Sequence, residues 1–273
     1  MYVFLNNKFL QTSKAKISVL DSGFLYGDGI YETIRTYNGK IFNLNNHFNR
    51  LKKSAKLLDL KTPFSKKELE TWIYTLIKKN KIKEARIRVT LTPGAVGFDK
   101  DKKAKPTLLI QTEKLKLPTK KELQNGVSVI TYKAERVHPE AKSICQLPQI
   151  LARVEMRKKK AYEVLLINKK NKVTEGSITN FYLIKNKTLL TPGKDILEGT
   201  TRKIILKIAK KLLKIKIKDI KLSDLYKADE CFISNAPRGI LPVVKINRKK
   251  VGKGKPGVYT KEIMQEFKKQ LPK

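Results

Sequence analysis

The most informative stretch of this chain runs from Val173 to Asn180 and reads Val-Thr-Glu-Gly-Ser-Ile-Thr-Asn. The pattern predicts a strand, a tight turn and a second strand, and Glu175 directly precedes Gly176 at the turn. A carboxylate held in such a turn has a fixed direction, and a neighbouring cation would keep it ionised. Glu175 is therefore a candidate partner for a protonated ring nitrogen, with an ordinary hairpin carboxylate as the alternative.

Upstream of this stretch, Lys142 stands apart from the lysine runs of the chain, just before a predicted helix. A lysine that forms a Schiff base with an aldehyde needs a lowered pKa, and an isolated, half-apolar setting favours this. Because the chain has 51 lysines, a surface role would be the simpler interpretation of Lys142 taken alone. Only the surrounding pattern makes it a candidate catalytic residue.

Downstream, the residues Gly199-Thr200-Thr201-Arg202 open a strongly periodic helix. Backbone N–H groups at a helix start, together with two hydroxyls, suit a phosphate, although Thr200 or Thr201 could instead cap the helix. Arg50 shares one face of an earlier predicted helix with His47 and could add a charged contact to the phosphate. A surface position is the alternative for Arg50.

Lysine, carboxylate and anion site together are the three groups that a pyridoxal 5'-phosphate (PLP) enzyme needs. Arg86 and Arg88 lie two apart on a predicted strand, so both point to one face and could bind a substrate carboxylate. Arg238, in a loop after a later strand, could do the same. Cys145 and Cys231 show no metal-ligand spacing, and the sequence predicts no metal site.

The formal net charge of +37 raises the question of a nucleic-acid partner. Only ten of the 61 basic residues are arginines, and the lysines are spread along helix faces. We therefore interpret the charge as solvated surface that could attract anionic metabolites, and expect neither a nucleic-acid nor a membrane partner. Two cysteines and the absence of a signal-peptide pattern favour a soluble, cytoplasmic protein.

Alternating strand and helix patterns predict two α/β (α+β) domains. We expect an N-terminal domain over residues 1–113, a polar linker over 114–126, and a C-terminal domain over 127–273 that carries most cofactor contacts. Asn6-Asn7 and Asn38-Gly39 predict hairpins, and Ser65 with Glu68 predicts a capping box at a helix start. Further helices are expected over 44–60, 148–160, 201–214 and 258–271, and further strands over 84–92, 106–112, 127–132, 163–168, 179–185, 188–191, 215–220, 230–234 and 242–246.

These residues resemble the class IV aminotransferase family of fold-type IV PLP enzymes, which includes D-amino-acid transaminases, branched-chain aminotransferases and 4-amino-4-deoxychorismate lyases. The likeness runs nearly end to end, through segments 20–32, 47–51, 141–143, 173–180, 196–202 and 228–243. It implies Lys142 as Schiff-base lysine and proton shuttle, and Glu175 on the pyridine nitrogen. It also implies Arg50, Thr200 and Thr201 on the phosphate, Tyr31 beside the substrate, a two-domain fold, and a homodimer.

The subfamily features are mixed. Residues Gly27 to Glu32 look most like the D-amino-acid transaminases, but the Arg-x-His pair typical of their carboxylate trap is missing from the segment Thr92 to Phe98. Arg88 with Arg238 could form a different trap. The Ser234-Asn235-Ala236 loop looks more like that of the deoxychorismate lyases.

We therefore expect a PLP-dependent transaminase that moves an amino group between an amino acid, in the first place a D-amino acid, and a 2-oxo acid. An aminodeoxychorismate lyase, a branched-chain L-amino-acid aminotransferase, and a basic nucleic-acid-binding protein that has kept the fold without the chemistry are the alternatives.

Overall fold

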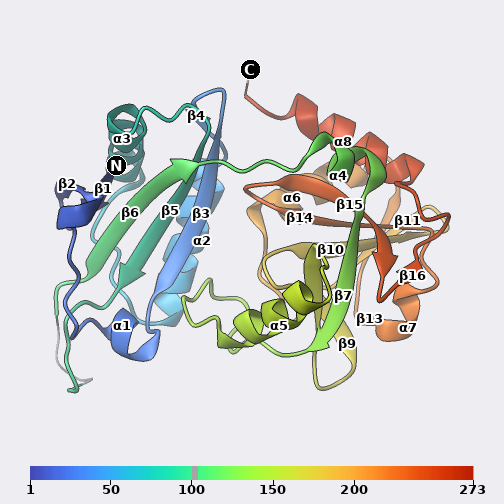
Figure 1. The fold of residues 1–273 in the computed structure, drawn as a ribbon, viewed down its shortest axis with the longest axis horizontal. Helices are drawn as coiled ribbons and strands as arrows, with labels where there is room; N and C mark the ends of the chain where they lie inside the picture. The colour runs from blue at the N-terminus through green and yellow to red at the C-terminus, as the bar shows by residue number, and fades with distance from the viewer. Residues whose placement is uncertain (100–103, 273) are drawn as a thin grey trace. The chain divides into compact units, whose positions relative to one another are not determined.

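The computed structural model describes residues 1–99 and 104–272, which form two compact units. The first unit contains Met1–Lys116, Ala141–Cys145 and Pro272, and the second contains Leu117–Glu140 and Gln146–Leu271. Figure 1 shows the course of the chain through both.

The first unit is an antiparallel sheet with helices on one face. In spatial order its strands are β2 (Lys8–Gln11), β1 (Tyr2–Leu5), β6 (Thr107–Lys114), β5 (Ala85–Thr92), β3 (Ile30–Tyr37) and β4 (Lys40–Ile41). Its helices are η1 (Thr12–Lys14), α1 (Ser22–Tyr26), α2 (Leu44–Leu57) and α3 (Lys66–Lys79). Both predicted hairpin turns form, with Asn6, Asn7, Asn38 and Gly39 at positive φ, and the predicted capping box of Ser65 and Glu68 is present.

The core of the first unit lies between the sheet and helices α2 and α3. Alternate residues of β5, such as Ile87 and Val89, are fully buried against apolar helix residues such as Leu51 and Ile73. The intervening residues of β5 therefore point to the opposite face, where Arg88 lies, as the strand period requires.

The second unit is built on a mixed ten-stranded sheet. Its main path is β12 (Lys214–Ile217), β11 (Thr188–Thr191), β10 (Asn180–Lys185), β14 (Glu230–Asn235), β15 (Gly239–Ile246), β7 (Val127–Lys133), β8 (Glu163–Ile167), β9 (Lys172–Gly176) and β13 (Ile220–Lys221), with β16 (Lys249–Lys250) paired to β15. Its helices are α4 (Lys120–Asn125), α5 (Leu147–Lys158), α6 (Thr200–Ala209), α7 (Leu222–Leu225) and α8 (Val258–Lys269).

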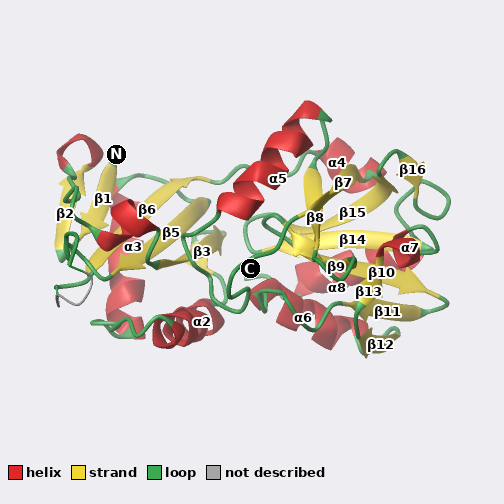
Figure 2. Ribbon diagram, turned by 90° about the horizontal axis from the view of Figure 1, so that it is seen from below, coloured by secondary structure: helices red, strands yellow, loops and turns green. Residues whose placement is uncertain are grey.

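Helix α5 packs against β7 and β8 through a small apolar cluster around Ala152, Val164 and Leu166. Helices α6 and α8 pack against each other and against β14. Figure 2 shows α5 apart from α6 and α8 within this unit. Helix α6 ends at Ala209, earlier than its apolar periodicity predicts, because the chain turns there towards β12.

Two features of the chain differ from the predicted boundaries. The expected linker contains the capped helix α4, in which the Thr119 side chain accepts a hydrogen bond from the Glu122 backbone. The segment Ala141–Cys145 belongs to the first unit, although it falls inside the range expected for the second domain. The reason is a set of long-range backbone hydrogen bonds to β3 and its neighbours, which no local pattern encodes.

Candidate functional site

Lys142 lies in an irregular segment whose backbone is held by three hydrogen bonds within the first unit. The Tyr31 N–H donates to the Lys142 carbonyl oxygen at 2.9 Å, and the Ile144 N–H donates to the Gly29 carbonyl oxygen at 2.9 Å. The Lys142 N–H itself donates to Oγ of Ser54, on helix α2, at 3.1 Å. The candidate lysine is thus fixed through its backbone to both β3 and α2.

The Tyr31 ring brings two cations together. Nζ of Lys142 lies 4.6 Å and Cζ of Arg88 lies 3.9 Å from the ring centroid. Such contacts are favourable because the face of an aromatic ring is electronegative. Burial lowers the pKa of Arg88 from its usual value, but a guanidinium remains charged at neutral pH. The structure therefore groups three predicted site residues, Tyr31, Arg88 and Lys142.

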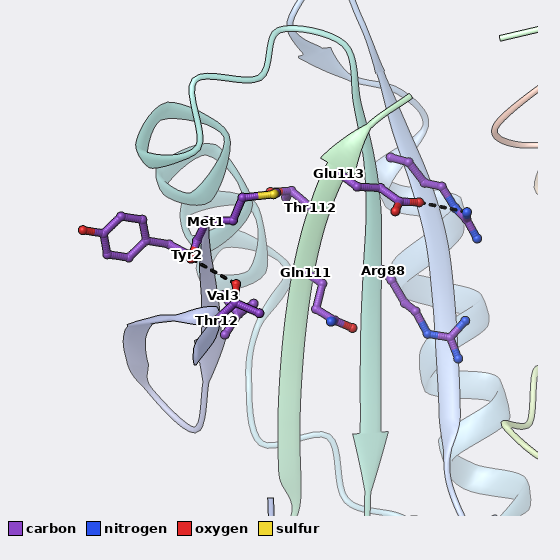
Figure 3. Close-up of a pocket in the computed structure, with 9 residues that line it drawn as sticks. Met1, Tyr2, Val3, Thr12, Arg88, Gln111, Thr112 and Glu113 are labelled. Atoms are coloured by element: carbon purple, nitrogen blue, oxygen red, sulfur yellow. Dashed lines mark hydrogen bonds and ion pairs between the residues drawn. The ribbon is translucent and has the colours of Figure 1, made fainter. Parts of the chain in front are cut away.

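Arg86 is not part of this group. Its Nη1 lies 2.9 Å from Oε1 of Glu113, and both side chains are largely exposed. Together with Arg88 it lines a cavity of about 390 Å³ on the first unit, which Figure 3 shows. The residues that line this cavity are Met1, Tyr2, Val3, Thr12, Arg86, Arg88, Gln111, Thr112 and Glu113. Since neither Lys142 nor Tyr31 lines it, this cavity shares only Arg88 with the group around the Tyr31 ring.

Arg50 is held by a carboxylate that the sequence interpretation missed. Its Nε and Nη2 each lie 2.7 Å from an oxygen of Glu32, which is 1% exposed. Nδ1 of His47 lies 2.8 Å from the same carboxylate, and because an ionised carboxylate only accepts, Nδ1 carries the proton. The bidentate pair fixes the plane of the Arg50 guanidinium.

Two pKa shifts follow from this burial. Desolvation alone would raise the pKa of the Glu32 carboxyl, but the charge and hydrogen bonds of Arg50, with those of His47, hold it well below its usual range. Burial lowers the pKa of His47 and outweighs its hydrogen bond to Glu32, so His47 is neutral at neutral pH. One clue was available in the sequence: Glu32 occupies an inward position between Ile30 and Ile34, where a carboxylate needs a buried partner.

In the second unit, Glu175 lies within strand β9, which continues to Gly176, so the turn begins after both residues. Glu175 is 5% exposed. Its Oε1 lies 2.6 Å from Nη1 of Arg136, and the Leu197 N–H donates to its Oε2 at 3.1 Å. Arg136, in the loop that follows β7, supplies the adjacent cation that an ionised Glu175 needs, and the sequence interpretation did not identify it. Glu175 is therefore held in a fixed, charged environment.

The turn after Glu175 is organised by a second buried carboxylate, Glu163, which is 2% exposed. The Ser177 hydroxyl donates to its Oε1 at 2.6 Å, and the Thr179 hydroxyl donates to its Oε2 at 3.1 Å. The Ser177 N–H adds a bond of 3.2 Å to Oε1. Gly176 is required in this turn, because a Cβ there would collide with Oγ1 of Thr179 and press on the Glu163 carboxyl.

The start of α6 is joined to Glu175 through the peptide of Leu197. While the Leu197 N–H donates to Glu175, its carbonyl oxygen accepts from the Asn180 side chain at 2.9 Å. Asn180 also packs against Gly199, where a Cβ would collide with its side-chain oxygen. Glu175 is therefore linked through Leu197 and Asn180 to the segment that leads into α6.

The donors at this helix start suit an anion. Gly199 is the N-cap and provides no side-chain cap, while Thr200 and Thr201 are buried. Nη2 of Arg202 donates to the Pro192 carbonyl oxygen at 2.8 Å, whereas Nε of Arg202 is buried without an acceptor among the described residues. Backbone N–H groups at a helix start, beside hydroxyls and a buried guanidinium, are the donor set that a phosphate takes.

Arg238 lies in the turn between β14 and β15, 5.2 Å above the centroid of the Tyr162 ring. The backbone N–H of Arg238 donates to Oδ1 of Asn235 at 2.9 Å. Arg238 belongs to the second unit, whereas Arg88 belongs to the first. Over residues 1–99 and 104–272, no group of three His, Cys, Asp or Glu residues could hold a metal ion, and no helix is long and apolar enough to cross a membrane.

The family model for amino-transferase class IV matches residues 29–246. The chain belongs to the class IV aminotransferases. The predicted family and the predicted α/β fold class are thereby confirmed. Class IV aminotransferases use PLP, which confirms the predicted cofactor, and the buried donors at the start of α6 fit its phosphate.

Relatives of this class IV aminotransferase carry two kinds of name. The "Putative branched-chain-amino-acid aminotransferase" of Methanocaldococcus jannaschii is 34% identical over 98% of this chain and 96% of its own. A D-alanine aminotransferase of Listeria monocytogenes is 32% identical over 99% and 96%. The solved branched-chain amino acid aminotransferase of Escherichia coli has a TM-score of 0.93 at 27% identity, over 99% of this chain and 94% of that one.

Proposed function

We propose that this class IV aminotransferase transfers an amino group between a D-amino acid and a 2-oxo acid. The observation that carries the proposal is the placement of Lys142 and Arg88 against one aromatic ring, that of Tyr31. An amine for the chemistry and a guanidinium for a carboxylate are thereby held close together. The D-configuration is supported by the relatives named D-alanine aminotransferases, which are 31–32% identical to this chain.

Each site residue has a defined task in this proposal. PLP, when bound, supplies an electron sink for the carbon that loses its proton. Lys142 would hold the cofactor through its aldehyde and would carry the substrate α-proton, while Arg88 and Arg238 are the candidate carboxylate partners. Glu175, paired with Arg136 at 2.6 Å, would accept the proton-bearing nitrogen of the pyridine ring as its hydrogen-bond partner.

Each unit has its own candidate residues for the cofactor phosphate. Thr200 and Thr201 would donate from the start of α6, where the backbone N–H groups carry no side-chain cap. Arg50 would contribute a guanidinium whose direction is set by Glu32.

The test is a set of half-reactions followed by visible absorbance. Purified protein with PLP is mixed separately with D-alanine, D-glutamate, L-leucine and L-glutamate, and we expect the cofactor band to be lost with the D-amino acids only. Loss with L-leucine and L-glutamate only would replace the D-amino-acid assignment with the branched-chain one. A stable band with all four would contradict transamination of these substrates and favour a lyase.

Lys142→Ala should abolish turnover, because it removes the amine assigned to both the cofactor linkage and the proton transfer. Lys170→Ala, an exposed lysine of the second unit, is the matched control and should retain wild-type kcat. Undiminished turnover of the Lys142→Ala protein would refute the assignment of this residue.

The branched-chain L-amino-acid reaction is the second candidate. It is favoured by the name of the Methanocaldococcus jannaschii relative and by those of the solved neighbours, which include the branched-chain aminotransferase of Thermoproteus uzoniensis with norvaline, at a TM-score of 0.90. The half-reactions above separate the two candidates, because they differ in the configuration of the amino acid that reacts.

We also propose that the protein is a cytoplasmic homodimer. Two segments of the first unit that are hydrogen bonded to each other, through the Gly97 N–H and the Leu20 carbonyl oxygen, expose large apolar side chains. Phe24 is 73% and Phe98 is 82% exposed, and exposed apolar side chains of this size favour association with a second copy. A monomeric mass by analytical ultracentrifugation would rule this out.

A further inference from the structure

Helix α2 carries three polar side chains of little exposure, at positions 47, 50 and 54. His47 and Arg50 both contact the buried Glu32. Ser54 is 0% exposed and reaches a different segment, since its Oγ accepts the N–H of Lys142 at 3.1 Å. One stripe of this helix therefore touches both the buried ion pair and the backbone of the candidate lysine.

The bond made by Ser54 is unlike the usual one for a hydroxyl in a helix. Thr71 and Thr75 of helix α3 donate to carbonyl oxygens four residues back, which satisfies the hydroxyl within its own helix. Ser54 instead accepts from a residue 88 positions away in the sequence. Its hydroxyl joins two elements that the chain brings together only on folding.

Lys142 depends on such contacts because it lies in neither a helix nor a strand. Its carbonyl oxygen accepts from the Tyr31 N–H, and its N–H donates to Ser54. Removal of the Ser54 hydroxyl takes away the acceptor that ties this backbone to helix α2. The peptide group between Ala141 and Lys142 could then rotate, and Nζ of Lys142 would leave its position over the Tyr31 ring.

We propose that Ser54 is a positioning residue for the amino-group transfer. Its hydroxyl holds the Lys142 backbone so that the amine stays where the reaction needs it, and Ser54 acts through this backbone contact. This inference rests on the proposed role of Lys142.

The experiment compares Ser54→Ala with the wild-type holoenzyme. Because misplacement of a reacting group slows chemistry more than binding, kcat should fall about tenfold while KM stays within about twofold. In Ser54→Ala without added substrate, the backbone N–H of Lys142 should exchange its hydrogen at least about tenfold faster than in the wild type, because it loses its acceptor. Ser54→Cys is the second variant, for use if Ser54→Ala does not fold. Its thiol fills nearly the same volume but is a weak acceptor, so the same changes in kcat and exchange are expected.

Thr36→Val is the matched control. Thr36 is also 0% exposed in the first unit, and its Oγ1 accepts the Ala85 N–H at 2.7 Å. This variant loses a comparable buried hydroxyl but should keep wild-type kcat and wild-type exchange at Lys142. An equal fall of kcat in Thr36→Val and Ser54→Ala would reduce Ser54 to a general stability role.

The two proposals fail in different ways. Active Lys142→Ala protein would refute the proposed role of Lys142 in the reaction. Inactive Lys142→Ala protein together with unchanged kcat and unchanged Lys142 exchange in Ser54→Ala would overturn the positioning role alone.

Discussion

Glu32 and Glu163 are two carboxylates buried to nearly the same extent, at 1% and 2% exposure, in the first and second units. Glu32 is compensated by charge, through the bidentate contact of Arg50 and a proton donated by His47. Glu163 accepts from hydroxyls and backbone N–H groups, and within the described ranges of the chain it forms no ion pair.

The difference shows two ways to keep a buried carboxylate in place. Around Glu32, one cation provides most of the compensation, so the carboxylate and Arg50 each depend on the other. Around Glu163, five donors share the task, so the loss of any one leaves the others. The first arrangement holds a guanidinium in one direction, whereas the second holds the backbone turn that follows Glu175.

The largest effect is expected from Arg50→Leu, which leaves Glu32 buried without its main partner. The free energy of unfolding should fall by about 3–5 kcal/mol, measured by urea denaturation. Arg86→Leu removes the exposed pair with Glu113 and should cost only about 0–1 kcal/mol. Equal losses in the two variants would show that burial does not set the strength of the Glu32–Arg50 pair.

Glu163→Gln should have a smaller effect, of about 1.5–3 kcal/mol by the same measurement. The glutamine keeps the shape, but its amide NH₂ replaces an acceptor and faces a donor of the turn. If Glu163→Gln lost as much stability as Arg50→Leu, a carboxylate held by several hydrogen bonds would be no more tolerant of substitution than one held by a single ion pair.

The third effect is a change with pH, and it concerns Glu32 alone. Because its pKa is lower in the folded than in the unfolded protein, its stabilising contribution is complete above the ordinary carboxyl pKa of 4.5. That contribution decreases as pH falls from there towards the lower folded value. The difference in unfolding free energy between wild type and Glu32→Gln should therefore narrow by about 1 kcal/mol per pH unit below about pH 4.

Urea denaturation of both proteins between about pH 6 and pH 3 would measure this narrowing. A difference that stayed constant over the range would mean that Glu32 titrates alike in the folded and unfolded chain. A difference that widened on acidification would reverse the sign of the shift.

Much of the fold and part of the candidate site could be predicted from local sequence. The turn residues Asn6-Asn7 and Asn38-Gly39 encode their hairpins through positive φ, and Ser65 with Glu68 encodes a helix start through two short hydrogen bonds. The two-residue period of β5 placed Arg88 on the face opposite the core. These relations span at most a few residues, so the chain specifies them without reference to the rest of the molecule.

The remaining site contacts were decided by tertiary structure. Arg50 meets Glu32 from 18 positions away, Arg136 meets Glu175 from 39, and Ser54 meets Lys142 from 88. Such contacts place Lys142 in the first unit, although the segments on both sides of Ala141–Cys145 belong to the second. No periodicity spans such separations, so these contacts follow only from the strand pairing and helix packing that bring the segments together.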